Sequence, residues 1–509
     1  MDDKAASPVS HNQYVEDGDA VRGEAFTHVP GVRGKIMRLA AKIGVEQRGI
    51  ERVPEDERHD NSILNVGTMW LSANMVVSSF AIGLLGQSVF YMGIADSFLT
   101  ILFFNLIGVL PVCLFSTFGP VFGLRQMVLS RFWFGWWGVK LIGIFNIIAC
   151  IGWSAVNSIV GAQLINAVNP KVDGAAGIVI IGICTFIVCF FGYRVVHAFE
   201  AWAWIPVFII YLILIGVFAH SGAYRHIEWS TGKAEMGSVL SFGSIIYGFA
   251  TGWSSYAADY TVYQPRNQNR KLVFISTFLG LIIPILFCEM LGAGIYSATS
   301  INGGDNRYAD GFATSKVGGL LAAVLFPPLG GFGKFVLVIL ALSIVANNLP
   351  NIYSVSLTAQ ILGRYAAKVP RFVWTLIASI IYVAIAIPGY SHFEAVLSEF
   401  MDMIGYWLAA YEGVALADHF VFKRGTKNYD VSHWDQPNML PPGIAAIFSF
   451  CMGIVGMVLG MSQPWYVGKI ALSAGEAPFG GDVGFELAFA FAFTSYCITR
   501  PFEKKHFKR

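Results

Sequence analysis

Aromatic and amide residues lie inside long apolar segments of this chain, where polar side chains are costly unless they have partners. Trp153 and Asn157 are four residues apart, so on a helix they share one face. In a later apolar segment Trp253 follows Gly252 directly. A lone tryptophan in such a segment is more often a packing residue, and a lone asparagine more often an interhelical hydrogen-bond partner. The combination of tryptophan and asparagine points to a binding site more specifically than either residue does alone.

A third group contains three asparagines around a proline. Asn347 and Asn351 share a helix face, and Pro350 removes the hydrogen bond to the carbonyl of Ala346. An asparagine offers one acceptor and two donors on one side chain. Aromatic rings stack on planar bases with about 1–3 kcal/mol per base. Together, these residue types suit a flat heterocycle such as a nucleobase, with rings against its faces and amides at its edge.

Acidic residues inside apolar segments are candidates for carrying a proton. Our candidate is Glu289, which lies in the middle of one segment; Glu399, Asp402 and Glu412 follow one another along a later one. Each could instead be the structural partner of a neighbour. The seven cysteines have no metal-binding or disulfide spacing, and we find no zinc-protease motif or phosphate-binding loop. We therefore predict no metal, no cofactor and no catalytic residue, and the chain is not expected to be an enzyme.

The elements that must position these residues follow from composition. Hydrophobic residues make up 55% of the 509 residues and charged residues 13%, about half the charged share of an ordinary soluble domain. A helix that crosses a bilayer needs about 20 mostly apolar residues. We expect an all-α membrane protein with twelve transmembrane helices, at about 66–90, 94–117, 139–168, 175–193, 198–219, 238–260, 272–297, 332–360, 371–389, 393–420, 441–461 and 483–499. The apolar stretch 314–329 is expected to be a short interfacial helix.

Lysines and arginines in the connections predict the orientation. They gather in the connections after the even-numbered spans and in the C-terminal tail, which ends Lys504, Lys505, Lys508 and Arg509. By the positive-inside rule both termini are cytoplasmic, and we expect a multi-pass protein of the plasma membrane. The net charge of +2, without a basic stripe, gives no sign of a nucleic-acid partner.

Two glycine-bearing interruptions indicate that the chain has two halves. They lie at 78–83 in the first span and at 247–255 in the sixth. An offset of five spans inserts the halves in opposite orientations, and paired interruptions of this kind point to the central site of a transporter. The predicted division is an N-terminal tail (1–60), two five-helix repeats (61–222 and 223–422), helices 11 and 12 (423–499) and a C-terminal tail (500–509).

Several stretches resemble the nucleobase–cation symporter family, in its fungal purine–cytosine permease branch. They are GVEQRGIERVP (44–54), SANMVVSSFAIGLLG (72–86), FGPVFGLRQMVLSRFWFG (118–135), GWSAVNSIVGAQL (152–164), GWSSYAADYTVYQP (252–265) and NNLPNIYS (347–354). The resemblance implies a five-plus-five inverted repeat (LeuT-like) with two extra C-terminal helices. It also implies a substrate site between helices 1, 3, 6 and 8.

The resemblance assigns roles to individual residues. It implies that the two tryptophans sandwich the base, that the helix 8 asparagines recognise its edge, and that the helix 1 serine faces the substrate. The predicted substrate-binding residues are Ser79, Trp153, Asn157, Gly252, Trp253, Asn347 and Asn351.

The coupling ion is predicted from a missing pair of hydroxyl residues. Sodium-coupled relatives hold the ion between helices 1 and 8 with a pair of hydroxyls, whereas here only Ser343 precedes Asn347 at the matching turn. We therefore expect import of adenine, guanine, hypoxanthine and cytosine by proton symport with alternating access. The alternatives are another small heterocycle (uracil, allantoin, a vitamin or a riboside) on the same fold, or a nutrient sensor that does not transport.

Overall fold

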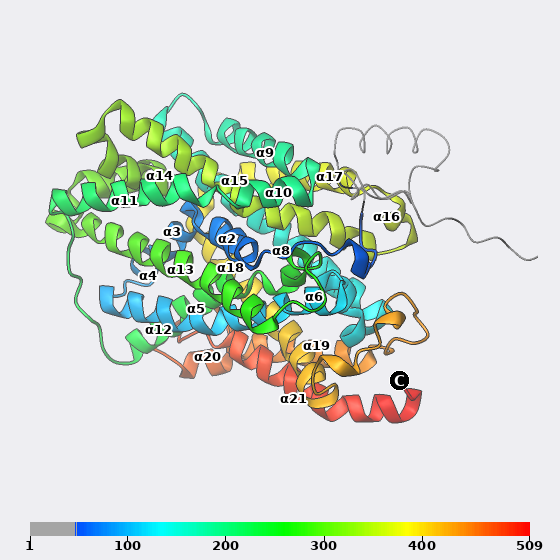
Figure 1. The fold of residues 1–509 in the computed structure, drawn as a ribbon. Coiled ribbons are helices and arrows are strands. Elements are labelled where there is room, and N and C mark those ends of the chain that lie inside the picture. Colours follow the sequence, from blue (N-terminus) through cyan, green and yellow to red (C-terminus); the bar gives the residue numbers. More distant parts are fainter. Residues whose placement is uncertain (1–45, 47) are drawn as a thin grey trace, which may run out of the picture.

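The computed structural model describes residue 46 and residues 48–509, and all twelve predicted segments are occupied by helices (Figure 1). Most of the predicted tail, residues 1–45 and 47, lies outside the described residues. The described remainder packs against the helices. Arg58 is buried and donates to the backbone oxygens of Val53 (3.0 Å from Nε) and Pro120 (2.9 Å from Nη1).

The first half of the described chain contains the following helices: α2 (Ile63–Asn74), α3 (Val77–Gly83), α4 (Leu85–Ser88), α5 (Ile94–Ser116), α6 (Phe118–Phe122), α7 (Gln126–Leu129), α8 (Arg131–Val168), α9 (Gly174–Phe191), α10 (Tyr193–Glu200) and α11 (Trp204–Ser221). Gly135 bends α8, because its φ of +70° lies in a region that glycine adopts without strain. The apolar part of α8 follows this bend, which explains why the sequence pattern starts near residue 139.

The second half comprises α12 (Lys233–Thr251), η3 (Ser254–Tyr260), α13 (Arg270–Tyr296), η4 (Ser297–Gly304), α14 (Arg307–Leu329), α15 (Gly331–Ile361), α16 (Arg364–Lys368), α17 (Arg371–Gly389), α18 (Phe393–Leu416) and the π-helical turn η6 (Ala417–Phe422). The C-terminal part comprises α19 (Ile444–Gly460), the short antiparallel strands β1 (Ser462–Gln463) and β2 (Tyr466–Val467), α20 (Lys469–Ser473) and α21 (Gly484–Phe507).

Eight of the described helical stretches are long and apolar enough to cross a membrane, and a ninth is the pair of helices that bends by 60° between Asn74 and Val77. One of the eight, Arg371–Phe422, contains two predicted spans, and α19 is apolar but shorter. The helix α14 is also among the eight. The second part of α14 corresponds to the short helix expected at 314–329, because Ser315 and Lys316 leave helical geometry and divide Arg307–Leu329 at that point.

The two predicted interruptions are present. The first span is broken between α2 and α3, and the sixth leaves α-helical geometry after Thr251, with Tyr256 at φ −146° and ψ 16°. The packing of the halves repeats with a shift of five spans: α2 and α3 pack on α13, and α12 packs on α5. Likewise α8 packs on α9 and α15 packs on α17, while α8 and α15 pack on each other.

The last two predicted spans, α19 and α21, pack on each other and on α18 at one side of the bundle (orange and red in Figure 1). The first described residues and the C-terminus lie at the same end of the bundle (Figure 1). We call this the terminal end. An even number of crossings requires that arrangement.

Candidate functional site

A cavity lies where the broken sixth span meets α8, α15 and α18. It encloses about 310 Å³ of empty space, including the part that opens to solvent. Its lining includes Trp153, Phe249, Gly252, Trp253, Asn351 and Met401. Four of the seven predicted substrate-binding residues are therefore brought together.

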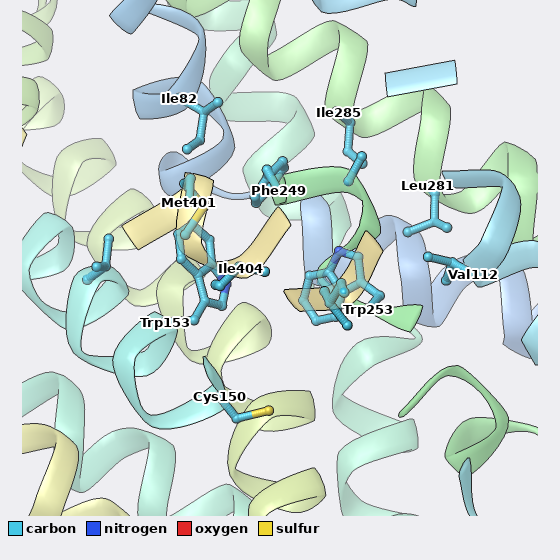
Figure 2. Close-up of a cluster of buried hydrophobic side chains, with 14 of the residues drawn as sticks. Ile82, Val112, Cys150, Trp153, Phe249, Trp253, Leu281, Ile285, Met401 and Ile404 are labelled. Atoms are coloured by element: carbon cyan, nitrogen blue, oxygen red, sulfur yellow. The ribbon is translucent and has the colours of Figure 1, made fainter. Parts of the chain in front are cut away.

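The two predicted tryptophans approach the cavity from different elements. Figure 2 shows their indole rings on either side of Phe249 and Ile404. The ring of Trp153 is tilted against that of Phe249, with centroids 5.4 Å apart. The ring of Trp253 meets Trp70 edge-on at 5.5 Å. Trp253 is 2% exposed, and its indole nitrogen has no hydrogen-bond partner among the described residues. That nitrogen is an unused donor at the cavity wall.

Asn347 connects α15 to α8 and to the broken first span. Its Oδ1 accepts from Trp153 Nε1 and from Asn157 Nδ2, both at 2.6 Å. Its Nδ2 donates to the carbonyl oxygen of Ala73 at 2.5 Å. Asn157 donates also to Asn348 Oδ1 at 2.9 Å. Asn157 and Asn347 therefore lie behind the Trp153 indole, which they orient, and neither lines the cavity.

Asn351 is the predicted amide that lies at the cavity. Its Nδ2 donates to the backbone oxygen of Asn347 one turn earlier at 2.7 Å. Its Oδ1 accepts from the hydroxyl of Tyr256 at 2.8 Å. A primary amide has a second N–H and its oxygen a second lone pair. Asn351 is therefore held in place from two sides and keeps hydrogen-bonding capacity for a ligand.

Some polar groups at the break of the first span bond to α15, whereas Asn74 Oδ1 and the hydroxyl of Ser78 are buried without a hydrogen-bond partner among the described residues. The hydroxyl of Ser343 accepts from the backbone N–H of Val77 at 3.2 Å and donates to Leu340 O at 2.6 Å. Ser79, a predicted substrate contact, donates instead to the backbone oxygen of Asn74 at 2.7 Å and does not line the cavity. The hydroxyls of Ser343 and Ser79 thus already have hydrogen-bond partners within the protein.

Glu289, the predicted proton carrier, is buried on α13. Its Oε2 accepts from Asn105 Nδ2 of α5 at 2.6 Å. Its backbone lies against Gly83 of α3, so closely that a methyl group at that glycine would overlap the Glu289 carbonyl. Glu289 does not line the cavity.

Several lining residues were not predicted from the sequence, among them Gly248, Phe249, Tyr256, Met401 and Ile404. Met401 and Ile404 are ordinary apolar residues of α18, and nothing in their spacing distinguishes them from packing residues. Tyr256 carried a usable signal, since it lies three residues after Trp253 inside the interrupted span. The assembled cavity has aromatic walls, small residues at the broken helix and one oriented amide. The residue types of this lining suit a planar heterocycle.

Comparisons with known proteins find similar sequences along most of the chain. The sequence model of a family described as permeases for cytosine/purines, uracil, thiamine and allantoin matches residues 52–470. The chain is 61% identical over 490 residues to the purine-cytosine permease fcyB of Emericella nidulans, covering 96% of this chain and 95% of that protein. It is 44% identical over 508 residues to the purine-cytosine permease FCY21 of Saccharomyces cerevisiae, covering 99% and 95%.

Among solved structures, the chain is similar to Mhp1, a nucleobase-cation-symport-1 family transporter, in a closed conformation with bromovinylhydantoin bound. The TM-score is 0.67 with 14% sequence identity, and the match covers 90% of this chain and 96% of that one. At this identity the likeness establishes the fold. It confirms the predicted class, a helical membrane protein with the LeuT-like inverted repeat.

Proposed function

The chain belongs to the family of permeases for cytosine/purines, uracil, thiamine and allantoin, and from this premise we propose that it imports purine bases and cytosine by proton symport. The bases are adenine, guanine and hypoxanthine in addition to cytosine. The proposed protein is a secondary active transporter of the plasma membrane with both termini in the cytoplasm. Its partners are the nucleobase, the proton and the surrounding bilayer.

The observation that carries the substrate class is the pairing of two indole rings with one oriented amide at a single cavity. Trp153 and Trp253 supply apolar surfaces, Gly252 lets the backbone approach, and Asn351 offers polar atoms for the base edge. A buried donor without a partner favours a ligand that brings an acceptor, and Trp253 Nε1 is such a donor. A carbonyl or ring nitrogen of a base meets that requirement.

The other predicted contacts act one layer further out in the described conformation. Asn157 and Asn347 orient Trp153, and Ser79 stabilises the broken first span. Direct contact of these three residues with the base stays a prediction. In alternating access the broken spans move relative to the rest of the bundle, so the lining of the cavity differs between conformations.

Proton coupling is supported by the contacts between the first span and α15. A sodium ion needs several oxygen ligands that are free to turn toward it. Here the carbonyl of Ala73 accepts from Asn347 and the hydroxyl of Ser343 accepts from Val77. The amide nitrogen of Asn347 thus supplies the positive partner that an ion would provide. Glu289 stays the proton carrier predicted from the sequence.

The test is uptake of radiolabelled cytosine by yeast that lacks its own purine–cytosine permeases. We expect saturable uptake that unlabelled adenine, guanine and hypoxanthine reduce. A protonophore should abolish accumulation, and replacement of sodium by choline should leave it unchanged. Cells carrying the empty vector are the control.

Each alternative has its own result in the same assay. If uracil, allantoin, thiamine, pyridoxine or a riboside competes and purines do not, the competing compound would be assigned as the substrate instead of purines and cytosine. Accumulation that survives a protonophore and requires sodium would assign sodium, and not the proton, as the coupling ion. A protein present at the cell surface without any uptake would favour a sensor.

A further inference from the structure

A second buried carboxylate lies next to the cavity, on α18. Glu412 is 1% exposed. Its Oε2 accepts from the hydroxyl of Tyr247 at 2.8 Å, and its Oε1 accepts from the hydroxyl of Thr251. No lysine, arginine or histidine of the described chain forms an ion pair with it. A carboxylate in a transmembrane segment without a cation is costly when ionised, and such residues are usually functional.

Both donors to Glu412 belong to the broken sixth span. Tyr247 directly precedes Gly248, and Thr251 directly precedes Gly252. Both glycines line the cavity. The carboxylate is therefore attached to the helix segment that forms one cavity wall. On its own helix it lies eight residues after Ile404, about 12 Å along the axis toward the terminal end.

The charge state of Glu412 decides how these hydrogen bonds can form. An ionised carboxylate only accepts, so it can take both hydroxyl protons at once. A protonated carboxyl group must donate one bond, so one of the two hydroxyls has to turn round or separate. Proton uptake on Glu412 thus rearranges the hydrogen bonds between α18 and α12, and proton release restores them.

We propose that Glu412 binds and releases the coupling proton, and that its bonds to Tyr247 and Thr251 transmit the protonation state to the cavity wall. The inference rests on the proposed proton symport. A proton from the outer solution binds the carboxylate to give the neutral acid while the cavity faces outward. The acid then loses that proton to the cytoplasmic solution after the cavity has opened inward, and no other bond changes.

The surroundings of Glu412 contain few other charges. The titratable groups around it and its partners are Tyr411 on α18 itself, Asp259 on η3 and Glu486 on α21. The contact with α8 is aromatic, between Trp407 and Phe145, and α19 carries no charged residue. No cation from a packed element thus holds Glu412 permanently ionised.

Glu289 lacks this connection to the cavity. Its described side-chain partner is Asn105, and that pair joins α13 to α5 without touching a lining residue. Among the described residues, Glu289 therefore has no hydrogen bond to a helix segment that lines the cavity.

The test uses the full-length protein reconstituted in liposomes with an imposed pH gradient. Glu412→Gln keeps the size of the side chain and removes the titration. We expect exchange of labelled for unlabelled cytosine to continue with a KM within about threefold of wild type, because Glu412 does not line the cavity. Accumulation above equilibrium should be lost, and uptake should no longer depend on pH. Glu476→Gln, in an exposed loop, is the control and should keep gradient-driven accumulation.

A second variant addresses the case in which Glu412→Gln does not fold. Tyr247→Phe keeps the ring that stacks on Phe485 at 3.8 Å and removes one donor to the carboxylate. Loss of a donor to the ionised form favours the protonated form. The pH of half-maximal uptake should therefore rise by about one unit.

The outcomes separate the two proposals. Gradient-driven accumulation by Glu412→Gln, or an unchanged pH midpoint in Tyr247→Phe, would overturn the role of Glu412 while leaving proton symport intact. Loss of accumulation in Glu289→Gln, with Glu412→Gln unaffected, would assign the proton to Glu289. A wild-type protein that binds and exchanges cytosine but ignores the pH gradient would overturn proton symport itself, and Glu412 with it.

Discussion

At the scale of single residues, the side-chain amide of Asn347 determines how the cavity is built. One oxygen accepts from the Trp153 indole and from Asn157, while the nitrogen donates to the Ala73 carbonyl. Hydrogen bonds between buried polar groups reinforce one another, and a group left unpaired there is costly. The position of Trp153 therefore depends on contacts that reach across three spans.

The sequence predicted part of this arrangement. Helical spacing placed Trp153 with Asn157, and Asn347 with Asn351, on shared faces. It could not show that Asn351 would line the cavity while Asn347 turned to the first span. Helical periodicity shows which residues share one face of a helix. Which other helix contacts that face depends on how helices distant in the sequence cross. Met401 and Ile404 were missed for the same reason.

Replacement of Asn351 by alanine tests the amide at the cavity. We expect cytosine uptake to fall at least about tenfold, because a lost hydrogen bond to a buried polar ligand costs about 1–3 kcal/mol. The Tyr256 hydroxyl also loses its acceptor. The measurement is initial uptake of labelled cytosine, normalised to protein at the cell surface. Asn438→Ala, in an exposed loop, is the matched control. Wild-type uptake in Asn351→Ala would remove this residue from the site.

At the scale of elements, the sixth span touches α18 through glycine. Gly248 lies against the backbone of Met401, and Gly405 faces Gly248 with a gap that leaves no room for a side chain. Small residues permit this close approach of helices in membranes. The sequence indicated the interrupted spans correctly, because glycine clusters are visible in it. It did not reveal which helix each glycine would contact.

A methyl group added at Gly248 should separate α12 from α18. The new Cβ would overlap the carbonyl oxygen of Met401, and overpacking of this kind costs about 1–3 kcal/mol. We expect Gly248→Ala to lower the thermal unfolding temperature of the purified protein and to reduce uptake strongly. Gly216→Ala on α11 is the matched control, because no atom lies within 4 Å of a Cβ built there. Equal behaviour of the two variants would contradict the proposed close contact.

At the scale of the whole molecule, the two halves use the same packing scheme in opposite orientations. The contacts of α2 and α3 with α13 repeat as the contacts of α12 with α5. The sequence indicated this symmetry from two interruptions and the charge of the connections. Two interruptions do not specify which helices contact each other. The repeat boundaries at 61–222 and 223–422 stay predictions.

The orientation in the membrane yields the last prediction. The first described residues and the C-terminus lie at one end of the bundle, and the connection between α11 and α12 follows an odd number of predicted crossings (Figure 1). Lysines and arginines concentrate near the terminal end, and positively charged connections stay in the cytoplasm. A cysteine introduced at Ser230, in the α11–α12 connection, should therefore face the outside. One introduced at Lys505, after the last predicted span, should face the cytoplasm.

A membrane-impermeant maleimide distinguishes these positions in whole cells. Both residues are exposed, so accessibility depends on the side of the membrane and not on burial. Ser230→Cys should react in intact cells, and Lys505→Cys only after permeabilisation. The unmodified protein is the control for its seven native cysteines. Labelling of Lys505→Cys in intact cells would show that the predicted orientation is wrong. The terminal end of the bundle would then face the outside of the cell. Import driven by an inward proton gradient requires that the proton and the base leave the cavity on the same side, and the labelling shows which end of the bundle faces that side.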